Sequence, residues 1–157
     1  MSAAAREPAA LLGLLWLASP ALPVGGFSYS EGLEAAVEAG RVAQEAQAAD
    51  WLSDQLALTL ARADGPIVAQ AMQAWQSADL PAVARLNAWV HASRESSELL
   101  LQAEQMGRSL TEWLKNGAQR ADGRIAALAA LTPAPTWPVA YADRKSTRLN
   151  SSHEWIS

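Results

Sequence analysis

The chain has 157 residues, a formal net charge of −4 and no cysteine. Its length suits one domain, and the lack of cysteine excludes disulfides, thiolate metal sites and a cysteine nucleophile. The acidic balance argues against a nucleic-acid groove, which needs a basic face. Only one phenylalanine and two tyrosines occur although 50% of the residues are hydrophobic. Because sheets favour aromatic and β-branched residues, we expect an all-α, compact helical bundle.

The first elements expected are two helices joined by a loop. Pro8 opens an apolar helix that ends near Ser19, and prolines and glycines then predict a loop as far as Gly26. Ser28 and Glu31 fit a capping box for a helix that ends at Gly40. The apolar stretch after Arg6 weakly resembles a secretion signal, but the acidic Glu7 argues against export.

Three further helices follow from the apolar spacing. In the first, at residues 44–62, we expect an inward face of Leu52, Leu56, Thr59 and Leu60. Asp64-Gly65-Pro66 predicts a break before the second, and Asp79 with Pro81 predicts the start of the third. The apolar positions expected to face the core of the second and third are Val68, Ala71, Met72, Trp75, Leu86, Trp89 and Val90.

Beyond a polar patch at residues 93–97 the helical pattern resumes and ends at Lys115-Asn116-Gly117. Its predicted apolar stripe comprises Leu99, Ala103, Met106, Leu110 and Trp113. A short helix is expected from Asp122 to Leu131, and three prolines after it predict a linker. Gly107 lies inside a helix, where glycine costs about 1 kcal/mol relative to alanine. This cost indicates close approach by a neighbouring helix or by a partner protein.

The last fifteen residues differ from the rest of the chain. Alanine is frequent up to Ala142 and absent from residues 143–157, which resemble the in-frame translation of a sequencing adapter. We therefore expect a native partial domain at residues 1–142 and a non-native tail at 143–157, to be left out of fold reasoning. The alternative is a genuine basic tail.

The sequence offers little for catalysis or metal binding. Ser28 and His91 could act as nucleophile and base, but a structural or surface role is favoured for His91 because no orienting partner is apparent. Gly25 and Gly26 lack the following lysine of a phosphate-binding loop and are expected to permit a tight turn. One native histidine without cysteines argues against a transition-metal site.

Two polar patches interrupt the apolar helices, one at residues 93–97 and one around Arg108. They are either solvated surface, with Arg94 paired to Glu98 at i, i+4, or a contact face for another protein.

Several blocks of the sequence are similar to the UreF family. Residues 14–42 resemble its N-terminal signature, including Pro-Val-Gly-Gly-Phe-Ser-Tyr-Ser-Glu-Gly at residues 23–32. Asp64-Gly65-Pro66, residues 93–99 and residues 105–110 resemble further blocks in the same order. The similarity covers residues 11–142, and family members continue past the proline-rich segment with further helices.

This resemblance implies a non-enzymatic, cytoplasmic urease maturation chaperone that dimerises when full length. In the family, UreF joins UreD (also called UreH) and the GTPase UreG to deliver nickel into apo-urease, and it modulates the GTP cycle of UreG. No cofactor is expected on this chain itself, since nickel is handled by the complex. The alternative is a helical protein-interaction module unrelated to urease. The residues expected to contact partners or shape the motif are Gly25, Gly26, Phe27, Ser28, Tyr29, Ser30, Glu31, Arg94, Glu95 and Arg108.

Overall fold

The computed structural model describes residues 32–116 and 122–143, together with Leu15, Ser19, Leu22, Val24 and Gly25. These residues form helices and no strands, so the predicted all-α fold is confirmed. The helices are α2 (Leu33–Glu38), α3 (Glu45–Asp54), η2 (Gln55–Asp64), α4 (Gly65–Gln76), α5 (Leu80–Ser93), α6 (Ser97–Asn116) and α7 (Gly123–Ala129). Residues 137–143 are also helical.

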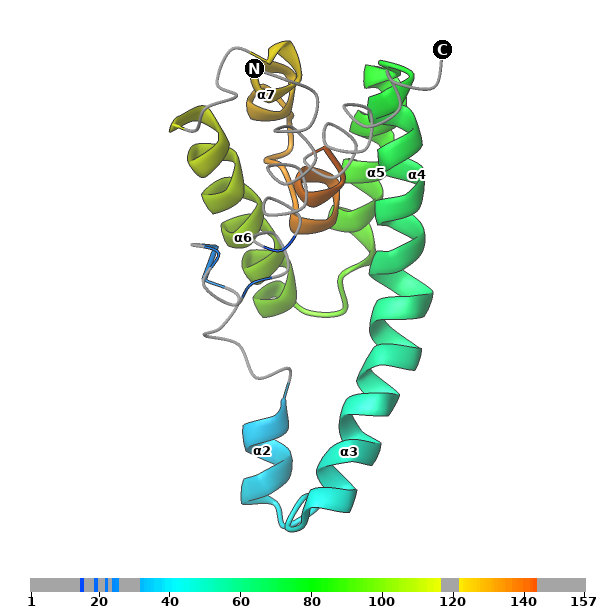
Figure 1. The fold of residues 1–157 in the computed structure, drawn as a ribbon, viewed down its shortest axis with the longest axis vertical. Coiled ribbons are helices and arrows are strands. Elements are labelled where there is room, and N and C mark those ends of the chain that lie inside the picture. The colour runs from blue at the N-terminus through cyan, green and yellow to red at the C-terminus, as the bar shows by residue number, and fades with distance from the viewer. Residues whose placement is uncertain are drawn as a thin grey trace, which may run out of the picture.

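The core of the bundle lies among α4 to α7 and residues 137–143 (Figure 1). Trp75 is 1% exposed, and its indole Nε1 donates a hydrogen bond to the Val139 carbonyl at 3.1 Å. The predicted core positions Ala71 and Val90 are buried. Trp89 was expected on the same face but is 52% exposed, because the face of α5 toward the core is already occupied by Val90 and its neighbours one turn away.

Asp64-Gly65-Pro66 does not break the helix, contrary to the sequence prediction. α3, η2 and α4 form one continuous rod, which widens to i→i+5 hydrogen bonding over η2 (Figure 1). Pro66 has no N–H, and in a regular α-helix its ring would clash with the carbonyl four residues earlier. The wider turns accommodate the proline, and the Gly65 N–H bonds the Leu60 carbonyl instead.

The α3 and η2 part of the rod extends beyond the bundle, and together with α2 it forms an arm (Figure 1). The prediction that Leu52, Leu56 and Leu60 face inward is wrong here, since they are 52%, 58% and 52% exposed. The side chain of Thr59, expected on the same face, lies outside the described residues. No residue of α3 is buried, so the arm depends on few tertiary contacts.

Short polar contacts mark several helix ends. The Asp79 carboxylate accepts a hydrogen bond from the Ala82 N–H at 2.9 Å, which confirms the predicted cap of α5. Asp122 accepts from the Arg124 N–H at 3.0 Å at the start of α7. In the first turn of α6, hydrogen bonds from the backbone and from neighbouring serine hydroxyls lower the pKa of Glu98.

The proline-rich segment is not a linker, contrary to expectation. Pro135, Thr136, Pro138, Val139 and Ala140 are all buried, and the helical residues 137–143 pack at the centre of the bundle (Figure 1). A linker stays exposed when no surface is available to pack against it. Here α5 and α6 provide such a surface for the proline-rich segment.

Candidate functional site

The centre of the molecule is a buried polar junction at which α5 holds residues 133–136. The Asn87 side chain is 1% exposed. Its Nδ2 donates to the carbonyls of Pro133 at 2.8 Å and Ala134 at 3.1 Å. Its Oδ1 accepts from the backbone N–H and the hydroxyl of Thr136, both at 2.9 Å. One amide therefore satisfies four backbone or hydroxyl groups of a segment without regular hydrogen bonding.

His91, one turn after Asn87, extends this junction to α6. Its Nε2 lies 2.8 Å from the Ala134 carbonyl, so this nitrogen carries the proton and donates it. Its Nδ1 lies 3.4 Å from the carboxylate of Glu104 on α6. Both ring nitrogens face structural partners, as expected for a structural histidine. Ser28, the proposed nucleophile, lies outside the described residues.

Glu104 connects the junction to the surface through Arg108. Glu104 pairs with Arg108 one turn later on α6, and the Arg108 side chain is 53% exposed. The ion pair uses the terminal Nη2 of the guanidinium, which leaves its other N–H groups available as donors. Arg108 is thus an exposed cation on a rigid helix, which suits the partner contact predicted for it.

Gly107 confirms the close approach expected from the sequence. A Cβ atom at this position would lie 2.2 Å from the Pro135 carbonyl oxygen. The neighbour is therefore the proline-rich segment, and its backbone packs directly against α6. The Thr111 hydroxyl donates to the Gly107 carbonyl at 2.7 Å, within the same helix.

The other predicted site residues at the polar patch have different roles. Arg94 does not pair with Glu98 as the spacing suggested, because it lies in an extended conformation between α5 and α6. Its Nη2 instead donates to Asp64 Oδ1 at 2.8 Å, with both side chains partly buried. This ion pair joins the α5–α6 connection to the rod. Glu95, next in the chain, is exposed.

The glycine-rich motif is described only in part. Gly25 is exposed and has φ of 76°, so the predicted glycine turn is confirmed at this position. Gly26, Phe27, Ser28, Tyr29, Ser30 and Glu31 lie outside the described residues. The described part of the following helix begins at Leu33, after Gly32 with φ of 80°.

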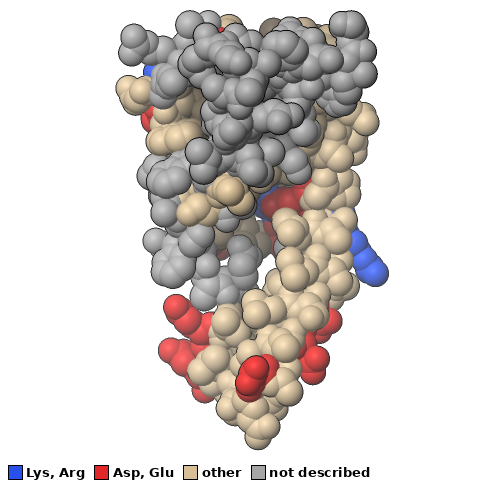
Figure 2. All heavy atoms as spheres, in the orientation of Figure 1, with Lys and Arg blue, Asp and Glu red and all other residues tan. Residues whose placement is uncertain are grey.

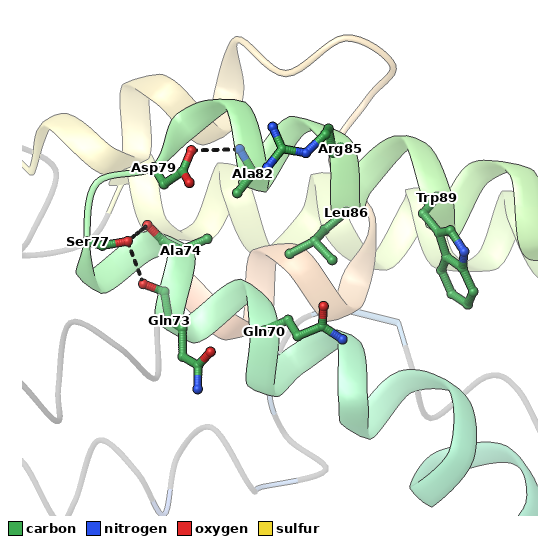
Figure 3. Close-up of a pocket in the computed structure, with 9 residues that line it drawn as sticks. All are labelled: Gln70, Gln73, Ala74, Ser77, Asp79, Ala82, Arg85, Leu86 and Trp89. Atoms are coloured by element: carbon green, nitrogen blue, oxygen red, sulfur yellow. Dashed lines mark hydrogen bonds between the residues drawn. The ribbon is translucent and has the colours of Figure 1, made fainter.

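A separate open groove of about 470 Å³ lies between α4 and α5 (Figure 3). At one end Ser77 and Asp79 already bond the helix backbone, through Gln73, Ala74 and Ala82. Gln70, Arg85, Leu86 and Trp89 line the rest (Figure 3). The groove has the character of a protein contact surface more than of a reaction centre, because its charged groups do not converge on one point.

Sequence reasoning missed Asn87 and Glu104, which organise the junction. An available signal was the spacing of Asn87 and His91 at i, i+4 on a helix whose other face residues are apolar. Among the residues that the structure describes, no three histidines, cysteines or carboxylates gather to hold a metal ion. No helix in the same set is long and apolar enough to cross a membrane.

Comparison with known proteins identifies the family. The UreF family model matches residues 42–143. The urease accessory protein UreF of Methylibium petroleiphilum is 57% identical over 140 residues, which cover 89% of this chain and 59% of that protein. The Polaromonas protein of the same name is 56% identical over 142 residues, 90% of this chain and 60% of its own length.

A third relative is named as a bifunctional accessory protein. The bifunctional urease accessory protein UreEF of Bordetella bronchiseptica is 47% identical over 132 residues, 84% of this chain and 30% of that protein. The chain thus spans about three fifths of the length of the first two relatives. With the family match over residues 42–143 and these identities, the chain belongs to the UreF family of urease accessory proteins.

Proposed function

We propose that this protein is a non-catalytic scaffold in urease maturation. In this proposal it joins UreD (UreH) and the GTPase UreG in a cytoplasmic complex, modulates the GTP cycle of UreG and directs nickel, as cargo, into apo-urease. The observation that carries the proposal is the 57% identity to a urease accessory protein UreF over 89% of the chain. The fused UreEF relative supports a location close to UreE as well.

The described geometry supports a scaffold more than an enzyme. In the buried junction, the side chains of Asn87 and His91 form hydrogen bonds with the backbone of the same chain. The charged groups that face solvent nearby are Arg108, held on α6 by Glu104, and Glu95 in the connection between α5 and α6. We propose these two, with Arg94 and the motif at residues 25–31, as the partner-contacting or motif residues, and dimerisation as a property of the full-length protein.

We also propose that residues 143–157 are not native. The family match ends at residue 143, next to the compositional change after Ala142. A genomic read across this junction should continue into further helix-patterned sequence. A genome that encodes the tail as written would contradict this boundary.

The functional test is a chimera in which residues 1–142 replace the matching part of the Methylibium UreF, in a urease gene cluster that lacks its own UreF. We expect nickel-dependent urease activity to be restored. A folded chimera that leaves urease without nickel would overturn the proposed function.

Within this chimera, Arg108→Glu tests the contact surface. We expect a fall of about tenfold in partner affinity, equivalent to roughly 1.4 kcal/mol, because a rigidly held surface cation becomes an anion. Affinity for UreD and UreG is measured by titration with each purified partner. Lys115→Glu, an exposed cation that is likewise paired with a glutamate of α6, is the matched control and should leave both affinities unchanged.

A further inference from the structure

The arm carries an apolar surface with no partner among the described residues. Leu52, Leu56 and Leu60 follow one another at intervals of four along α3 and η2, and we call them the leucine face. They are 52%, 58% and 52% exposed. Single exposed leucines are ordinary, but successive ones on a projecting helix mark a binding surface.

The leucine face continues the side of the rod that meets the bundle. Asp64, about one turn after Leu60, bonds Arg94 of the α5–α6 connection at 2.8 Å. The next turns of the same rod bury Ile67 and Ala71 in the core. The leucine face and the buried residues of α4 therefore lie on the same side of the rod. Along the arm this side is uncovered, because the rod extends beyond the bundle (Figure 1).

The charge of the arm limits what can cover it. Residues 33–62 carry Glu34, Glu38, Glu45, Asp50 and Asp54 against Arg41 and Arg62. Figure 2 shows acidic side chains gathered around the end of the molecule formed by α2 and α3. Two such arms from two copies would place like charges together, which costs free energy. A segment with basic flanks beside its apolar side chains fits this surface better.

We propose that a helix from the part of the full-length protein outside these 157 residues packs on the leucine face. The chain spans 59% and 60% of the Methylibium and Polaromonas relatives, so about two fifths of their length is available to supply it. Its apolar side chains contact Leu52, Leu56 and Leu60, and its basic side chains lie beside the acidic groups of the arm. This inference is independent of the partners proposed above.

The test uses the full-length Methylibium UreF with a photo-reactive phenylalanine at the position that aligns with Leu56. Irradiation of the purified protein should give a cross-link within one chain, and mass spectrometry should map it to a segment that the 157 residues do not match. The control places the same group at the position aligned with Leu101, which is 54% exposed on α6. There we expect the yield of that cross-link to fall at least tenfold.

Other products would overturn the proposal. A cross-link between two chains at the Leu56 position would make a second copy the occupant. A cross-link that forms only after a purified accessory protein is added would make that partner the occupant. Absence of any cross-link, with the unmatched region folded by circular dichroism, would show that the leucine face stays free.

Discussion

At the scale of single residues, one buried amide does most to fix the proline-rich segment. Asn87 makes hydrogen bonds to Pro133, Ala134 and Thr136, all of which come from backbone that has no helix or sheet to pair with. A buried polar group left without a partner costs about 1–3 kcal/mol. Loss of any one of these hydrogen bonds would therefore weaken the attachment of the proline-rich segment. His91 adds a further hydrogen bond, to the Ala134 carbonyl.

The substitution Asn87→Leu should lower the free energy of unfolding by about 3 kcal/mol, because it leaves the buried N–H and hydroxyl of Thr136 and two partly buried carbonyls without their partner. Urea unfolding followed by tryptophan fluorescence gives this value. Gln70→Leu, an exposed amide to leucine change on α4, should stay within about 0.5 kcal/mol. An equal loss for both variants would mean that the junction has no special role.

At the scale of secondary-structure elements, packing decides where helices bend, end and touch. The rod continues through Pro66 by widening η2, while α5 ends at Ser93 and Arg94 becomes extended. α6 tolerates Gly107 because the backbone of Pro135 occupies the space of a side chain. At Gly107 a residue that is unfavourable in a helix is matched by a contact from elsewhere in the chain, whereas at Pro66 the helix itself changes its hydrogen bonding.

Gly107→Ala should therefore destabilise the protein by roughly 2–4 kcal/mol, although alanine favours helix by about 1 kcal/mol. The added Cβ would meet backbone rather than a side chain that can move. Gly123→Ala on α7 is the matched control, because nothing lies within 4 Å of its Cβ position. Thermal unfolding of both variants checks the difference, and similar Tm values would contradict the close packing.

At the scale of the whole molecule, a well-packed bundle carries an arm with an uncovered apolar side. The bundle buries Trp75, Leu110 and Leu128 almost completely, whereas α3 buries no residue at all. An exposed apolar patch of several hundred square ångströms favours association in solution. The acidic groups of two arms repel each other and so oppose this association, and added salt screens the repulsion.

The 157-residue protein should consequently self-associate, and more so as salt is raised. Leu56→Gln together with Leu60→Gln should shift its mass by light scattering toward the 16.7 kDa monomer without lowering the Tm, since both side chains are exposed. Leu101→Gln is the control for an exposed leucine outside the arm. A sharply folded monomer before any substitution would contradict this prediction.

The sequence by itself determined the helical class, most helix positions and the family. Apolar residues recur at helical spacing whatever they pack against, and caps such as Asp79 act within one turn. The motif blocks that resemble UreF are likewise a property of the chain alone. These features depend on neighbours close in sequence, which is why they can be predicted without a structure.

Only the tertiary structure decided which apolar faces are covered and what the polar residues bond. Leu56 and Val90 follow the same kind of pattern, yet one is 58% exposed and the other 1%. Arg94 bonds Asp64 thirty residues away rather than Glu98, and Pro135 and Pro138 are buried in the bundle instead of forming a linker. Such contacts join segments distant in sequence, and they exist only when the fold brings those segments together.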